Sequence, residues 1–267
     1  MGAAVILVAH AAFPAIQYEF IQTSRSDSDT TDFTARAFVD GERSKVEFLS
    51  GNAYPPGTYV ISSARKLLFV DPTQKSYTEL NTMSVASAIG TSSIKIDNFV
   101  PTVTKLDDQI LIAGIPAEHY RLTMTYDITV TFKAMPVKQS VYAVIDKWTT
   151  VQFGDVGEAV AMMNGLQTGN PKIDEMMAAE TTKIRGFPLK QTIQITTTNL
   201  SRRKSGTSQL KIPVTRTRSR EFTIIKVGEV PSKESAFIVP EGFRKLNFAE
   251  QAPKSQMQVL SLEPSSK

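Results

Sequence analysis

Histidine is scarce in this chain of 267 residues, where only His10 and His119 could act as a general base or bind a metal through an imidazole. Cysteine is absent, which excludes a thiol nucleophile, a thiolate metal site, a disulfide and a lipoprotein-type anchor. A Ser-His-Asp triad would depend on His119 alone, and the residues around it alternate like a strand. We therefore expect a hydrogen-bonded or exposed strand histidine, no enzyme activity and no cofactor.

Other motifs for catalysis or metal binding are missing or are explained by chance. The chain contains no GxSxG, no P-loop and no HExxH. Three Ser-x-x-Lys matches are about what the serine and lysine content gives at random, and their partner motifs are absent. Paired acids such as Asp107/Asp108 lack the glycine and terminal glutamate of a calcium loop, which favours solvated loops over a metal site.

Apolar side chains that could contact a ligand gather around one segment. Four of the nine methionines form two pairs that follow closely behind an aromatic pair. Flexible thioethers suit a surface that accommodates varied acyl chains, although methionine is also an ordinary gap-filler that could pack helices onto a sheet. The expected apolar-cavity residues are Trp148, Phe153, Met162, Met163, Met176 and Met177.

Positive charge is concentrated between Ser201 and Arg220, which contain seven of the cations and no acid, whereas the whole chain has a net charge of only +4. Spacing by two places arginines on one face of a strand, where their guanidinium groups suit phosphate or carboxylate. Few aromatics interleave the run, which argues against nucleic acid. A charged hairpin that protects a sheet edge is the alternative. The expected anion- or partner-binding residues are Arg202, Arg203, Lys204, Arg216, Arg218 and Arg220.

Residues 1–16 are apolar and uncharged apart from His10, and the run ends in Ala9-His10-Ala11. This resembles the hydrophobic region and cleavage site of a secretory signal, although the usual positive region before it is missing. The stretch is too short to span a bilayer. We expect a signal-peptide remnant and an exported, periplasmic or otherwise extracytoplasmic protein, with a buried first strand as the alternative.

Turn signals between alternating runs predict an antiparallel meander. Asp40-Gly41 separates two alternating segments, and Asp71-Pro72 separates two more, as in β-hairpins. Further strands are expected at about 102–112, 118–132, 138–148, 189–198 and 210–227, giving about ten in all, with a short helix in 82–89.

Two helices are expected between the third and fourth of these later strands. Asp155 with Glu158 resembles a capping box, and Asn170 with Pro171 is typical of a helix start. Together they form an expected helical insertion over about 154–185. The class is therefore α+β, with a single domain over 17–248 and a loose tail over 249–267.

Several stretches resemble, in order and spacing, the LolA-like extracytoplasmic proteins, and in particular an uncharacterised bacterial branch of that superfamily. The resemblance covers roughly residues 17–246 and lies in Ala35–Val46, Leu68–Pro72, Lys75–Tyr77, Ile112–Arg121, Trp148, Gly186–Leu189 and Phe237–Phe243. It implies a strongly curved antiparallel half-barrel capped by helices around an apolar concavity. The best-known relatives carry lipoproteins across the periplasm.

These observations lead to two main hypotheses. The first is an exported, non-enzymatic half-barrel whose concave side, capped by a helical pair, binds a lipid, a lipidated protein or another apolar ligand, while the basic hairpin faces an anionic membrane surface. The second is an envelope protein–protein interaction module with a filled core and a basic contact face. An esterase that uses a serine with His119 is a third class, and it requires both groups and a carboxylate to meet in a cleft.

Overall fold

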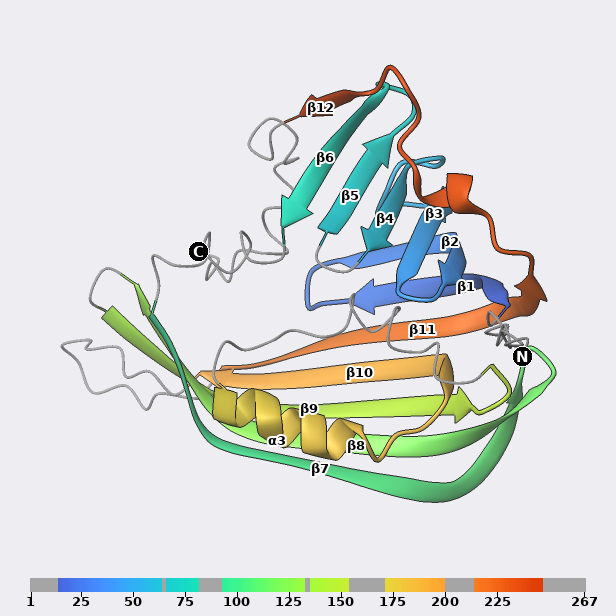
Figure 1. Ribbon diagram of the computed structural model, residues 1–267. Helices are drawn as coiled ribbons and strands as arrows, with labels where there is room; N and C mark the ends of the chain where they lie inside the picture. The colour runs from blue at the N-terminus through green and yellow to red at the C-terminus, as the bar shows by residue number, and fades with distance from the viewer. Residues whose placement is uncertain are drawn as a thin grey trace, which may run out of the picture.

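The computed structural model describes residues 14–63, 66–81, 93–132, 135–153, 171–199 and 214–246. Its strands form one twelve-stranded sheet in the order β12-β6-β5-β4-β3-β2-β1-β11-β10-β9-β8-β7 (Figure 1). The strands are β1 (Ala15–Arg25), β2 (Thr30–Asp40), β3 (Arg43–Gly51), β4 (Tyr59–Ser63), β5 (Lys66–Asp71), β6 (Ser76–Asn81), β7 (Ser93–Ile112), β8 (Ile115–Phe132), β9 (Met135–Thr150), β10 (Phe187–Asn199), β11 (Thr215–Val230) and β12 (Arg244–Leu246).

Neighbouring strands are antiparallel, except that β12 pairs with β6 in parallel. The sheet is strongly curved, and its two outermost described strands, β12 and β7, do not pair with each other (Figure 1). The expected antiparallel half-barrel is therefore confirmed as a large curved, open sheet. It has twelve described strands instead of about ten. The sheet begins at Ala15, so the domain boundary expected after residue 16 lies inside β1.

The predicted hairpins form where local turn chemistry specifies them. Gly41 adopts a φ of +58° between β2 and β3, as expected for a two-residue turn with positive φ. Asp71 fixes the turn between β5 and β6, because its Oδ1 accepts hydrogen bonds from the backbone N–H groups of Thr73 at 2.9 Å and Gln74 at 3.1 Å. Gly114, with a φ of +78°, lies in the turn between the long strands β7 and β8.

The expected helical pair is not supported. In the described part of the chain there is one α-helix, α3 (Pro171–Thr181), which begins at the predicted proline, together with a short 3₁₀ turn at Glu234–Phe237. The first helix of the expected pair, in 154–170, and the expected helix in 82–89 lie outside the described residues. The expected α+β class with two capping helices is therefore corrected to a predominantly β structure, with one α-helix in the described residues.

Helix α3 packs against β7, the last strand in the sheet order. The Glu180 carboxylate near the end of the helix accepts a hydrogen bond of 2.8 Å from the backbone N–H of Val103 on β7. This bond satisfies a donor on a sheet edge, which otherwise offers unpaired backbone groups to other chains.

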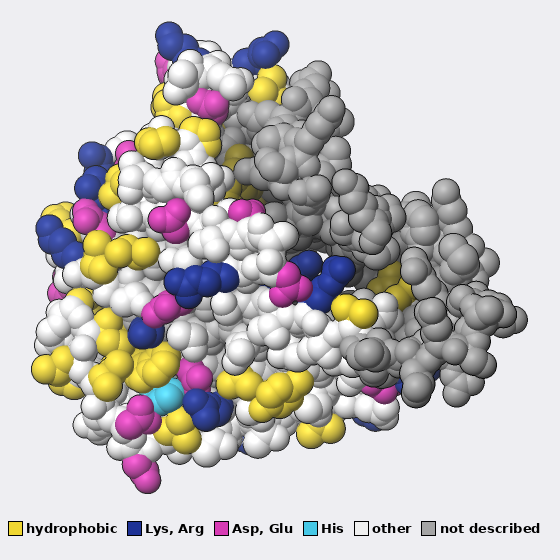
Figure 2. Space-filling view, turned by 180° about the vertical axis from the view of Figure 1, so that it is seen from behind, with side chains coloured by type: hydrophobic (Ala, Val, Ile, Leu, Met, Phe, Trp, Pro, Cys, Tyr) yellow, Lys and Arg dark blue, Asp and Glu magenta, His cyan; other side chains and the backbone are white. Residues whose placement is uncertain are grey.

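One face of strands β1 to β3 is covered, whereas the other carries charged side chains. In β2 the buried residues alternate with half-buried ones, such as Arg36, whose Nη2 lies 3.0 Å from Oε1 of Glu19 on β1. Seen from behind, the molecule shows acidic and basic side chains in small mixed groups between apolar ones (Figure 2). This alternation is the period-two pattern of a half-buried antiparallel sheet.

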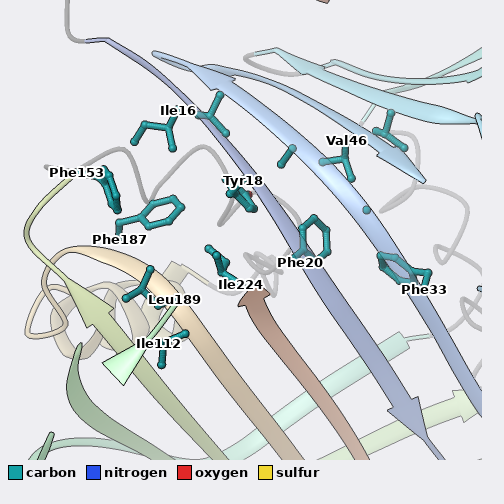
Figure 3. Packing of buried hydrophobic residues seen from close by; sticks show 14 of the residues in the cluster. Ile16, Tyr18, Phe20, Phe33, Val46, Ile112, Phe153, Phe187, Leu189 and Ile224 are labelled. Atoms are coloured by element: carbon teal, nitrogen blue, oxygen red, sulfur yellow. The ribbon is translucent and has the colours of Figure 1, made fainter. Parts of the chain in front are cut away.

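A cluster of aromatic side chains fills one end of the curved sheet (Figure 3). The ring centroids of Tyr18 and Phe187 lie 5.4 Å apart, and those of Phe153 and Phe187 lie 5.5 Å apart, both in edge-on geometry. The cluster also contains Phe48 of β3 and Ile112 of β7, although these strands are far apart in the sheet order. The sheet must therefore curve around the cluster, so we call the face that carries it the inner face and the opposite face the outer face.

We expect Phe187→Ala to destabilise the whole sheet, because Phe187 is fully buried and joins the strands on both sides of the cluster. The free energy of unfolding should fall by about 3–5 kcal/mol. Leu111→Ala is the control, since Leu111 is 71% exposed and its truncation should change stability by less than about 0.5 kcal/mol. Urea unfolding of both variants tests this, and equal effects would contradict the proposed core.

Candidate ligand-binding face

Beyond the aromatic cluster, the inner face continues across β8 to β11 as four rows of paired residues. Phe222 locates this face, because its ring lies 4.9 Å from that of the core residue Phe20. From β8 to β11 the rows are Tyr120, Lys147, Gln191 and Phe222; Leu122, Ile145, Ile193 and Arg220; Met124, Ala143, Ile195 and Arg218; and Tyr126, Val141, Thr197 and Arg216. We call these sixteen residues the inner patch. It contains cations but no acid.

The apolar part of the inner patch is unevenly covered. Leu122, Val141 and Ala143 are buried. Ile193 and Ile195, on the neighbouring strand, are only half-buried. Half-exposed isoleucines beside a buried apolar row form a surface that could contact further hydrocarbon.

Arg216, Arg218 and Arg220 form an arginine stripe along β11, at the border of the inner patch. All three side chains are exposed, and their cross-strand partners on β10 are Thr197, Ile195 and Ile193, as the spacing by two predicts. In the described part of the chain no ion pair is found for any of the three. The arginine stripe thus places uncompensated positive charge directly beside apolar surface.

Arg220 also lies near the aromatic core. Burial raises the pKa of the Tyr54 hydroxyl, and the positive charge of Arg220 opposes that rise. Tyr54 stacks on the core residue Phe48 at 4.0 Å between ring centroids. The Arg220 guanidinium group is therefore close enough to Tyr54 to influence its pKa, at the border between the core and the inner patch.

Lys147 is a cation in an apolar setting. Its neighbours in the first row of the inner patch are the buried residues Tyr120 and Gln191. Burial lowers the pKa of the Lys147 ammonium group, and no acid compensates for it. Neither Lys147 nor Gln191 has a side-chain hydrogen bond or ion pair to any residue within the described ranges. Sequence analysis missed Lys147, because its position in the chain does not show which face it occupies.

Of the apolar residues predicted from the sequence, two lie together at the aromatic cluster and two lie on α3. Phe153 belongs to the filled aromatic core, so we no longer regard it as a wall of a ligand cavity. Trp148 is partly buried, packs against the same cluster and stacks on His119 at 4.2 Å between ring centroids. Met176 and Met177 are half-buried on α3. The remaining predicted residues, Met162, Met163, Arg202, Arg203 and Lys204, lie outside the described residues.

His119 lies in an ion-pair cluster, on the side of β8 opposite to its neighbour Tyr120. Its Nδ1 is 2.7 Å from Oδ1 of Asp108, and its Nε2 is 3.0 Å from Oδ1 of Asp146. Arg121 donates to the same Asp146 carboxylate at 2.7 Å. A β-bulge in β7, between Leu106 and Gln109, supplies the extra residues that bring Asp108 to the imidazole.

This cluster does not have the geometry of a catalytic triad. Both ring nitrogens of the buried His119 already face carboxylates, so neither is directed at a serine hydroxyl. Figure 2 shows the histidine between acidic, basic and hydrophobic side chains. The expectation of a hydrogen-bonded strand histidine is confirmed, and the esterase hypothesis loses the base that it required.

Three further features of the described residues bear on function. A groove of about 510 Å³ lies outside the inner patch and has a mixed lining, in which the charged residues Arg36, Lys45, Glu47 and Lys233 alternate with apolar ones such as Phe38 and Val230. No group of three or more His, Cys, Asp or Glu side chains suited to a metal ion is found in the described ranges. None of the helices described has the length and apolar character that a membrane crossing requires.

No protein-family model matches the chain, and no curated protein matches it. Among solved structures it is similar to an uncharacterised conserved protein from Thermus thermophilus, with 7% identity and a TM-score of 0.34 over 86% of this chain and 90% of that one. It is also similar to the LolA superfamily protein NE2245 from Nitrosomonas europaea, with 10% identity and a TM-score of 0.30 over 85% and 90%.

A third similar structure is an outer membrane lipoprotein-sorting protein domain from Vibrio parahaemolyticus, with 9% identity and a TM-score of 0.32 over 85% of this chain and 90% of that one. LolA superfamily proteins are thus among the structural neighbours, as the sequence motifs predict.

We expect Asp146→Asn to lower the free energy of unfolding by about 2 kcal/mol at neutral pH, because it weakens charge-assisted bonds to both His119 and Arg121. Burial raises the pKa of the Asp146 carboxyl, but the bonds from Arg121 and His119 outweigh it, so the pKa lies below its ordinary value. A carboxyl with a depressed pKa in the folded state stabilises the protein above its unfolded-state pKa, and this contribution is lost as the pH falls.

The stability difference between the native protein and Asp146→Asn should therefore be complete above about pH 5 and shrink as the pH falls toward 2. Urea unfolding over this range measures it, with the exposed Asp27→Asn as control. A difference that stays constant down to pH 2 would show that the Asp146 charge does not stabilise the fold.

Proposed function

We propose that the protein is a non-enzymatic binding protein that holds a lipid, a lipidated protein or another apolar ligand on the inner patch. One observation carries this proposal: half-buried Ile193 and Ile195 extend the apolar inner face beyond the filled aromatic core. Transfer of hydrocarbon from water onto this surface would contribute about 0.8 kcal/mol for each buried CH₂ group. Binding would need no bond to be made or broken.

The ligand surface that we propose differs from the cavity expected from the sequence. The aromatic cluster occupies the end of the curve that contains Phe153, so a ligand would lie farther along β8 to β10. Half-buried Met176 and Met177 of α3 remain candidates to cover it, because α3 packs on the adjoining strand β7. Methionine side chains adapt readily to different hydrocarbon shapes.

An exported, periplasmic location is part of this proposal. It is supported by the signal-like apolar run that ends in Ala9-His10-Ala11 and by the resemblance of the sequence motifs to LolA-like extracytoplasmic proteins. A carrier in that compartment would move an apolar molecule through water between two membranes. Detection of the processed chain in a periplasmic extract tests the location separately from the binding.

A second function, an envelope protein–protein interaction module, is favoured by the filled aromatic core together with the exposed arginine stripe. An acidic partner would bind Arg216, Arg218 and Arg220 without entering the apolar rows. The two functions differ in what Ile195 does, because only a bound apolar ligand requires that side chain to stay apolar.

The test compares Ile195→Asp with Gln194→Asp, neighbouring substitutions whose side chains lie on opposite faces of β10. Each variant is purified from its native envelope without detergent, and co-purifying lipid is extracted and quantified by mass spectrometry. We expect near-stoichiometric lipid with the native protein and with Gln194→Asp, and a loss of about tenfold or more with Ile195→Asp. Absence of lipid from every preparation would favour the interaction module instead.

A further inference from the structure

A polar pair interrupts the otherwise apolar first row of the inner patch. Lys147 on β9 and Gln191 on β10 are directly paired, with Tyr120 and Phe222 on either side. Gln191 is 6% exposed and Lys147 is partly buried. No side-chain hydrogen bond or ion pair is found for either residue in the part of the chain that the structure describes, so both polar groups are free to bind a ligand.

A second cation of the inner patch lies near this pair, whereas the nearest acid on the same face of β8, Glu118, is already bonded to Lys105 and Tyr120, both at 2.8 Å. Arg220 lies in the next row and two strands away from Lys147, which corresponds to about 12 Å between Cα atoms at ordinary strand spacing. Long lysine and arginine side chains can span that separation from opposite sides of a single anionic group. The four rows contain no aspartate or glutamate that would compensate for these cations.

From this arrangement we infer that the ligand of the inner patch is an anionic amphiphile, whose phosphate or carboxylate headgroup binds Lys147 and Gln191, with Arg220 at the border. This inference rests on the proposed function and adds the charge class of the ligand. The headgroup would supply the acceptors that the ammonium and amide groups lack, while its chains lie on the apolar rows beside them. A desolvated ion pair of this kind gives specificity, because a ligand without the anion leaves the lysine unpartnered.

Lys190, a lysine outside the inner patch, does not form such an anion site. Lys190 precedes Gln191 on β10 but faces the outer surface, where its Nζ lies 3.0 Å from Oε1 of Glu221 and 5.3 Å from the centroid of the Trp148 ring. Its positive charge is therefore already compensated. Lys190 and Lys147 differ in face and partner but not in residue type, which makes Lys190→Met a matched control for Lys147→Met.

The experiment measures lipid uptake from vesicles of phosphatidylglycerol or of phosphatidylcholine with identical acyl chains. Purified, delipidated full-length protein is incubated with each vesicle, separated from it, and analysed for bound lipid by mass spectrometry. We expect the native protein to take up phosphatidylglycerol about tenfold better than phosphatidylcholine. Lys147→Met should abolish that preference while keeping uptake of phosphatidylcholine, whereas Lys190→Met should leave the preference intact.

Lys147→Met retains the length and apolar stem of lysine and removes a charge whose burial is unfavourable, so the variant should fold. Circular dichroism and thermal melting check this, and Gln191→Leu provides a second variant that should reduce the preference in the same direction. An excess of inorganic phosphate is added in a further arm, to distinguish a lipid headgroup from free phosphate. It should not displace the bound phosphatidylglycerol.

Four outcomes would overturn the inference. If Lys147→Met and Lys190→Met both kept the preference for phosphatidylglycerol, the selectivity would belong to the exposed arginine stripe. If inorganic phosphate displaced the bound phosphatidylglycerol, the site would recognise free phosphate and not a lipid. Equal uptake of both lipids by the native protein would remove the charge selectivity but leave the proposed function in place. Uptake of neither lipid would contradict the proposed function and the inference together.

Discussion

The aromatic cluster at one end of the sheet is the constraint on which the other features depend. Tyr18 of β1, Phe48 of β3 and Phe187 of β10 can share one core only if the sheet curves, and that curvature gives the inner face its concave form. Aromatic pairs in edge-on contact combine a large buried area with favourable geometry, so the curve is held where the rings meet. Beyond the rings, the same face carries the inner patch, whose residues are not needed to hold the curve.

Much of the sheet is predictable from the sequence, because its hairpins are specified locally. Asp40-Gly41 and Gly114 mark turns that need positive φ, and Pro171 marks the start of α3. The role of Phe153 is not predictable in this way. Its contact with Phe187 joins segments that are 34 residues apart in the chain, and alternation cannot distinguish a core ring from a ring that lines a cavity.

The polar part of the site is hidden from sequence analysis for a different reason. Spacing by two was enough to place the arginine stripe on one face of β11, but which face Lys147 occupies depends on its register with Tyr120 and Gln191. That register follows a β-bulge between Pro188 and Lys190, and a shift of one residue would exchange the two faces of a strand. An unpartnered lysine on an apolar face is therefore a property of strand pairing, which composition and spacing do not reveal.

Photocrosslinking with a diazirine-labelled fatty acid tests the central claim most directly, namely that hydrocarbon lies on the inner patch. After irradiation, the modified residues are mapped by tandem mass spectrometry. Adducts are predicted on Met124 and Ile195, and their chain neighbours Thr123 and Gln194, which face outward, should remain unmodified. Adducts that fall equally on both faces, or only on exposed residues such as Leu111, would contradict the account.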